Sequence, residues 1–243
     1  MKRILTLVLV AFTLVSTAQE SVLLRINYKK GEQFLIKMEM DQDMPAMAMN
    51  MTMDMAVDIK SAKEGVFETE TKFTRIGMDM LQGGMNMSYD SNMKDEELDE
   101  MGMALKGQMG PMLQIVITSK TDVFGKVSDV VITPNLPSAS QFADQSGNVV
   151  YPEKAVKVGD TWSIEKDENG MKMNYIYTVK SITKEKVGVD LSGKISGMAI
   201  GTISGDMSID RSVGIPMLFN MKMDMTVNGQ KVSTTMKMTT TKM

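Results

Sequence analysis

The chain contains neither cysteine nor histidine. Without imidazole or thiol groups it has no histidine base, no thiolate nucleophile and no nitrogen or sulfur-anion ligand set for zinc. Disulfides, which often stabilise exported proteins, are also excluded, so core packing alone must hold the fold. These absences exclude most hydrolase and zinc chemistries, and we expect a protein that is not an enzyme and carries no cofactor.

Long apolar runs are scarce, and the longest lies at the N-terminus. Lys2 and Arg3 precede an apolar run over residues 4–15 and small residues at 16–18, which predicts a signal peptide over residues 1–18. The run is too short to span a bilayer, and no cysteine follows it to carry a lipid anchor. We therefore expect a periplasmic or secreted chain that has no transmembrane segment after signal cleavage.

Clusters of basic residues are absent from the rest of the chain. Of its 27 Lys and Arg side chains, two lie in the predicted signal, which leaves 25 against 30 Asp and Glu side chains. A surface with this excess of negative charge repels nucleic acid and anionic membranes. We accordingly expect no nucleic acid partner.

What the chain does have is alternation of apolar and polar residues, the period of a half-buried strand. Odd positions from Met47 to Ile59 are apolar, whereas Asn50, Thr52 and Asp54 lie between them. Pairs such as Asn228-Gly229 separate alternating runs and favour tight hairpins. We predict an all-β fold of antiparallel sheets with one helical insertion near residues 92–106, and a short helical turn over residues 137–144.

Short matches between the two halves indicate an internal duplication. Residues 111–113 and 126–128 recur at 216–218 and 231–233 with one offset, and residues 60–61 and 87–90 match 180–181 and 207–210 with another. We predict two related β meanders that form a sandwich or a curved half-barrel. The expected organisation is a signal peptide (1–18), a first repeat with the helical insertion (19–133), a linker (134–154) and a second repeat (155–243).

Each half also opens with a similar motif, Lys-x-Gly-[Asp/Glu]-x-[Phe/Trp], over residues 29–34 and 157–162. This plan resembles an uncharacterised family of exported, β-rich proteins of Gram-negative envelopes. The resemblance implies an exported β fold and supplies no catalytic or binding residues. A looser likeness, in architecture alone, is to periplasmic lipoprotein carriers, whose curved sheet encloses an apolar cavity.

Methionine is unusually abundant, with 28 residues after Met1 against 10 leucines in the predicted mature chain. Three interpretations are open. Methionine simply fills the core, because it is flexible and replaces leucine at little cost; it lines a cavity for an apolar guest; or its thioethers bind a soft ion such as Cu(I) or Ag(I).

We favour an exported, non-catalytic binding protein that holds an apolar small molecule or lipid against a Met-lined concave sheet face. The candidate ligand-binding residues are Met47, Met49, Met51, Met53, Met55, Met221, Met223, Met225 and Trp162. The alternative soft-metal site comprises Met44, Met47, Met49 and Met51. A structural module that binds an envelope protein is the third alternative.

Overall fold

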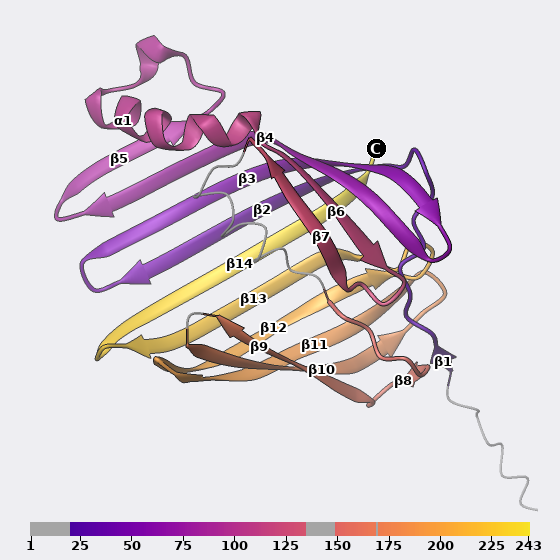
Figure 1. The fold of residues 1–243 in the computed structure, drawn as a ribbon. Coiled ribbons are helices and arrows are strands. Elements are labelled where there is room, and N and C mark those ends of the chain that lie inside the picture. The colour runs from indigo at the N-terminus through magenta and orange to yellow at the C-terminus, as the bar shows by residue number, and fades with distance from the viewer. Residues whose placement is uncertain (1–19, 135–148, 169) are drawn as a thin grey trace, which may run out of the picture.

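The computed structural model describes residues 20–134, 149–168 and 170–243, and it is built almost entirely of strands (Figure 1). The predicted signal peptide, the predicted turn over residues 137–144 and Asn169 lie outside these residues. The strands are β1 (Ser21–Val22), β2 (Gln33–Met44), β3 (Met47–Lys63), β4 (Val66–Gln82), β5 (Met85–Asp90), β6 (Val116–Asp122), β7 (Val127–Thr133), β8 (Val156–Lys157), β9 (Thr161–Glu168), β10 (Met171–Ile182), β11 (Lys186–Gly197), β12 (Ala199–Asp210), β13 (Pro216–Val227) and β14 (Gln230–Lys242). The helical elements are η1 (Asp95–Glu97), α1 (Glu100–Met109) and η2 (Gly110–Gln114).

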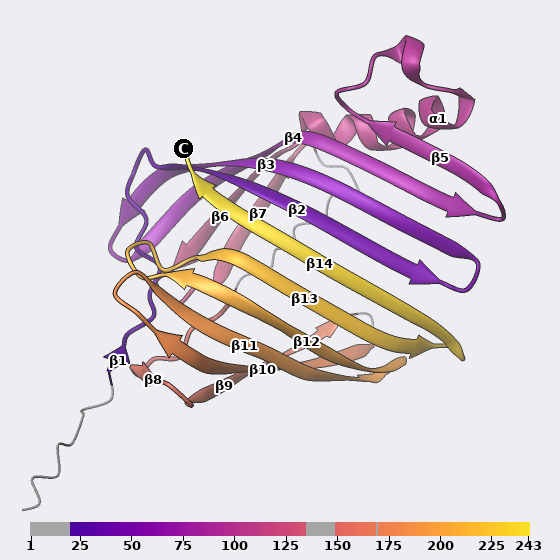
Figure 2. The same cartoon turned by 180° about the vertical axis from the view of Figure 1, so that it is seen from behind.

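Twelve of the strands form one antiparallel sheet in the order β7-β6-β4-β3-β2-β14-β13-β12-β11-β10-β9, and β5 also pairs with β4 (Figures 1 and 2). The two halves of the chain join where β14 pairs with β2. A second sheet has two strands, β1 and β8. The predicted all-β fold is confirmed, and of its two forms the structure adopts the single curved sheet rather than a sandwich.

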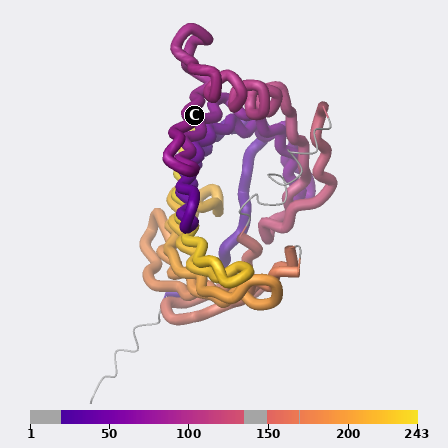
Figure 3. The backbone as a smooth tube through the Cα atoms, turned by 90° about the vertical axis from the view of Figure 1, so that its left-hand side faces the viewer, coloured from indigo at the N-terminus to yellow at the C-terminus, as the bar shows by residue number. Residues whose placement is uncertain are grey.

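Alternation decides which face of each strand turns inward. On β3, the odd-numbered residues Met51, Met53, Val57 and Ile59 are buried. This is what the alternation predicts, because every second side chain of a strand points to the same face. The sheet curls so that these inward side chains lie inside an incomplete ring, which Figure 3 shows in end view. Curvature is helped by bulges, where one strand carries an extra residue and bends; β3 and β4 change register twice.

The two motif openings, residues 29–34 and 157–162, make equivalent backbone hydrogen bonds. The amide of Gly31 donates to the carbonyl of Ile59, and the amide of Gly159 donates to that of Val179, both at 2.8 Å. The carboxylates of Glu32 and Asp160 accept from the amide three residues earlier in the same way. The match of residues 111–113 with 216–218 does not share this likeness, because the first lies in η2 and the second begins β13.

The helical insertion lies close to the predicted residues, but its regular helix begins later than Asn92. Asp99 caps α1, since its side chain accepts a hydrogen bond from the Gly102 amide at 2.7 Å. Leu105 and Met109 of α1 are buried, and the helix contacts β5 and η2. The insertion therefore acts as a cap over one part of the sheet's inner face.

The sheet forks along β4. Residues 77–82 of β4 pair with β5, residues 66–72 pair with β6, and residues 73–76 lie between these two ladders. An extra residue, Thr74, bulges from β4 at this point. One branch carries the helical insertion, whereas the other, β6 and β7, turns across the inner face (Figure 1).

Candidate functional site

Buried side chains form two separate clusters on the inner face of the sheet. The methionine cluster comprises Met51, Met53, Phe73, Ile76, Met87, Tyr89, Leu105, Met109, Met112 and Ile115. The large cluster is centred on β10 to β13 and also includes Phe34, Val57 and Phe67 from the first half. A single core is the usual arrangement in a domain of this size, so the division needs a physical cause.

A cavity of about 210 Å³ lies where the clusters meet, since members of both line it. Met53 and Phe73 come from the methionine cluster, and Phe34, Val57 and Phe219 come from the large cluster. The lining is mainly apolar and is supplied by β2, β3, β4, β6, β7, β13 and β14 together with the segments around Ile26 and Val149.

Five methionines form one wall of the cavity: Met38, Met53, Met55, Met236 and Met238. They come from three adjacent strands, β14, β2 and β3. Met238 is directly opposite Met38, and Met38 is directly opposite Met53. Methionine adapts its three rotatable bonds to irregular spaces, so this wall can adjust to a guest.

Hydroxyl groups form a second wall, supplied mostly by β4 and β6. Thr69, Thr71, Ser119, Thr121 and Thr240 all line the cavity. The hydroxyls of Thr69 and Ser119 lie 3.0 Å apart across the two strands and share a hydrogen bond. Each hydroxyl carries one donor and two acceptor lone pairs, so this wall retains capacity to bind a polar group of a ligand.

No Asp, Glu, Lys or Arg is among the described residues that line the cavity. Its two titratable groups are phenols. Burial, with a contribution from the charge of Glu32, raises the pKa of Tyr28 to about 12, and burial also raises the pKa of Tyr151. Both phenols are neutral at physiological pH, so the described residues of the lining carry no charge.

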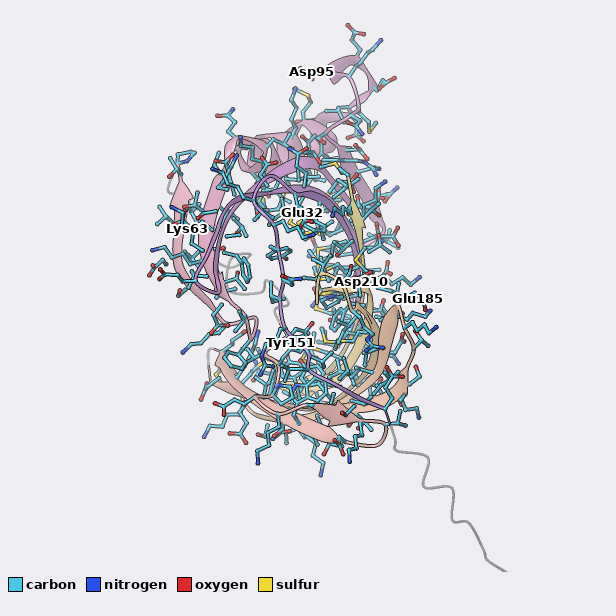
Figure 4. All side chains as sticks on the ribbon, turned by 90° about the vertical axis from the view of Figure 1, so that its right-hand side faces the viewer. Glu32, Lys63, Asp95, Tyr151, Glu185 and Asp210 are labelled. Carbon is cyan, nitrogen blue, oxygen red and sulfur yellow. The ribbon has the colours of Figure 1, made fainter. Side chains whose placement is uncertain are left out.

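Two segments that belong to no long strand close one end of the ring; we call residues 20–32 and 149–157 the strap. The Ile26 amide donates to the Val123 carbonyl beside the β6–β7 turn, and the Asn27 amide donates to the Val213 carbonyl beside the β12–β13 turn. The strap therefore ties together two turns that lie on opposite sides of the ring. Figures 3 and 4 show the first segment crossing the interior, and Figure 4 places Tyr151 inside the ring.

Tyr151 and Arg25 fix the strap in place. The Tyr151 hydroxyl donates to the carbonyl of Gly214 at 3.0 Å. The Arg25 guanidinium donates to the Pro152 and Glu153 carbonyls and lies 4.2 Å from the centre of the Phe124 ring. The hydroxyl of Tyr151 and the guanidinium of Arg25 both have partners in or beside the strap. We therefore assign these side chains to holding the strap rather than to binding a charged ligand.

Apart from Met47, which lies at the tip of the β2–β3 hairpin, the predicted ligand-binding residues belong to or contact the two core clusters, but not all of them lie at the cavity. Met53 and Met55 line it. Met221, Met223 and Met225 pack against the large cluster, and Met49 and Met51 belong to the methionine cluster or contact it. Trp162 stacks on Tyr177, with ring centres 5.0 Å apart, and its indole N–H donates to the Val150 carbonyl at 3.0 Å. Trp162 therefore supports the strap.

The four methionines of the predicted metal site do not face one another as a set. Met44 and Met47 are paired at the tip of the β2–β3 hairpin. Met49 is opposite Met80, whereas Met51 is opposite Met40 and Met78. Because directly opposite residues are closer than same-face neighbours along one strand, each of these methionines has its nearest methionine position across strands.

Sequence reasoning did not select Met38, Met236, Met238 or the hydroxyl wall as site residues. The three methionines carry the same alternation as Met53, so the pattern placed them on an inner face without indicating which strands are adjacent. The threonines of β4 alternate with glutamate and lysine, and in the sequence they cannot be distinguished from residues of a wet face.

Among the residues that the structure describes, no three or more Asp or Glu side chains gather so that they could hold a metal ion. Within the same residues, no helix is long and apolar enough to cross a membrane.

A family of unknown function, DUF6263, matches residues 141–242, a region that contains β8 to β14. The match covers less than half of the chain and supports the resemblance of this half to an uncharacterised family. No curated protein sequence matches the chain.

Proposed function

We propose that this protein is an exported, non-catalytic binding protein that holds an uncharged apolar molecule in the cavity between the two core clusters. The observation that carries the proposal is the cavity itself, which has a flexible methionine wall facing a wall of hydroxyls. Protein interiors are normally packed with few voids larger than a water molecule. A cavity of this size on the inner side of the sheet therefore favours an occupant.

The lining indicates the class of ligand. A charged group loses its hydration in such a site, and among the described lining residues there is no ionic partner to offset that cost. A neutral chain or ring with one hydroxyl, ester or carbonyl group fits better, because the hydroxyls of Thr69 and Ser119 can bind that group. A neutral lipid or a similar amphiphile has this chemistry.

The volume limits how much of the ligand is enclosed. A cavity of about 150 Å³ is enough for benzene, whereas pockets for drug-sized ligands are roughly 300–1,000 Å³. At about 210 Å³ the cavity accommodates one ring or a short length of acyl chain. The rest of a larger ligand would extend along the inner face beside the methionines.

The test measures binding of N-phenyl-1-naphthylamine, an uncharged apolar fluorophore, to the detergent-free mature chain. Thr71→Phe fills the cavity from its wall, and Thr118→Phe adds the same ring to an exposed position on β6. We expect Thr71→Phe to weaken binding at least tenfold and Thr118→Phe to leave it unchanged. Thermal unfolding of both variants checks that each is folded.

Native mass spectrometry of the protein purified from its own cell envelope, without detergent, tests the natural occupant. We expect an added mass in the range of a small lipid, and we expect Thr71→Phe to lose it. A wild-type protein that binds no fluorophore and carries no added mass would sink the proposal and favour a structural module.

A further inference from the structure

The geometry points to a second ligand of the same cavity: we infer that Met38, Met53 and Met238 bind one soft monovalent ion, Cu(I) or Ag(I). This goes beyond carriage of an apolar molecule, because the donors are the thioether sulfurs rather than the apolar surface. It also replaces the set of Met44, Met47, Met49 and Met51 with three residues that face each other.

The register brings these three side chains together. Met238 on β14 is directly opposite Met38 on β2, and Met38 is directly opposite Met53 on β3. Directly opposite residues have Cβ atoms about 4.5–5.5 Å apart, whereas neighbours on the same face of one strand are about 6.6–6.8 Å apart. The trio is thus closer together than any three successive inward methionines of one strand.

All three residues line the cavity, so each of them borders free space. Met53 is only 1% exposed to bulk solvent, and Met38 and Met238 are half-buried. A bound ion would be shielded from bulk water yet surrounded by flexible thioether arms. The next row, Met40, Met51 and Met236, is paired in the same way, but only Met236 of that row lines the cavity.

The donor set selects the ion. Soft thioethers suit Cu(I) and its analogue Ag(I), whereas calcium and magnesium require oxygen ligands and zinc prefers thiolate, imidazole or carboxylate. The chain has no cysteine or histidine, and no carboxylate is among the described residues of the lining. Phe219, opposite Met238, adds an aromatic ring, a group that attracts cations.

Methionine rather than leucine at positions 38, 53 and 238 supports ion binding. Leucine has a similar volume and would fill a wall equally well at little cost in stability. Leucine would, however, present no donor to the cavity. Core packing alone therefore does not select methionine over leucine at these three cavity-lining positions, whereas ion binding requires the thioether.

The experiment titrates the mature protein with Ag(I) in chloride-free buffer, followed by calorimetry and native mass spectrometry, and with Cu(I) in anaerobic competition with bicinchoninate. The test variant combines Met38→Leu, Met53→Leu and Met238→Leu. The control combines Met85→Leu, Met101→Leu and Met103→Leu, which change exposed methionines. We expect one ion per chain in the wild type and the control, at least a hundredfold weaker binding in the test variant, and no binding of Zn(II) or Ca(II).

Methionine methyl resonances of the wild-type protein give a measurement that needs no triple variant. Single Met→Leu changes assign the resonances, and we expect one equivalent of Ag(I) to shift those of Met38, Met53 and Met238 most. Shifts confined to other methionines, or a test variant that binds silver as the wild type does, would overturn the inference.

Failure of the metal site can be told apart from failure of apolar binding. The leucine variant keeps the apolar volume of the wall, so it should still bind N-phenyl-1-naphthylamine. Thr71→Phe removes space but no thioether, so it should lose the fluorophore and retain silver. A protein that binds the fluorophore but no silver would reject the metal site alone.

Discussion

Replacing Gly214 with alanine should release the strap from the sheet. Gly214 has φ of +75°, and a Cβ built there would lie 1.7 Å from the carbonyl oxygen of Arg25. The left-handed backbone costs an alanine about 1–2 kcal/mol. The collision is with backbone, so the strap must move and two hydrogen bonds, from the Asn27 amide and the Tyr151 hydroxyl, weaken at about 1 kcal/mol each. We expect a total loss of about 3–4 kcal/mol.

Gly229→Ala is the matched control, because Gly229 has φ of +79° but no heavy atom within 4 Å of the added Cβ. It should lose only the conformational part, about 1–2 kcal/mol. Urea unfolding of the two variants measures the difference, and binding of N-phenyl-1-naphthylamine should weaken only in Gly214→Ala, because the strap lines the cavity. Equal destabilisation of the two variants, with unchanged binding in both, would refute the role assigned to the strap.

Four further substitutions test individual contacts and core packing. The hydrogen bond from Arg75 holds the pKa of Asp90 below its usual value. The stability that this pair contributes is therefore present above about pH 4 and is lost as the pH falls through the folded-state pKa. Between pH 7 and pH 3 the urea midpoint should fall less in Asp90→Asn than in the wild type. Trp162→Phe should cost about 1 kcal/mol, because its hydrogen bond to a strap carbonyl is lost, and thermal unfolding measures this. Met207→Ala, in the packed large cluster, should cost about 2–5 kcal/mol in urea unfolding, and Met53→Ala, beside an existing void, should fall at the low end of that range.

Local features of the fold follow from the sequence because they depend on neighbouring residues. Alternation from Met47 to Ile59 identified the inward face of β3, and Asn228-Gly229 correctly identified the β13–β14 turn. The shared openings of the two halves also proved structural, since the Gly31 and Gly159 amides make equivalent hydrogen bonds.

Features that depend on distant pairing could not be predicted. Nothing in the sequence selects β14 as the partner of β2, yet this pairing places Met238 beside Met38. The strap has too few residues in a regular pattern to be assigned, and its contacts span more than a hundred residues, as between Arg25 and Pro152. The hydroxyl wall was hidden because threonine is compatible with either face of a strand.

The fork in β4 explains why the cavity exists and why it has two unlike walls. Where β5 and β6 separate, around Phe73, no single layer of side chains can cover the inner face. The β5 branch, its helical insertion, and Ile117 and Ile132 of the β6–β7 branch pack on the methionine cluster, whereas the strap packs into the large cluster. The void lies between, with methionines of the continuous sheet on one side and hydroxyls of the diverging branch on the other. A change that closes the fork should therefore abolish both ligand sites together, whereas changes in one wall should separate them.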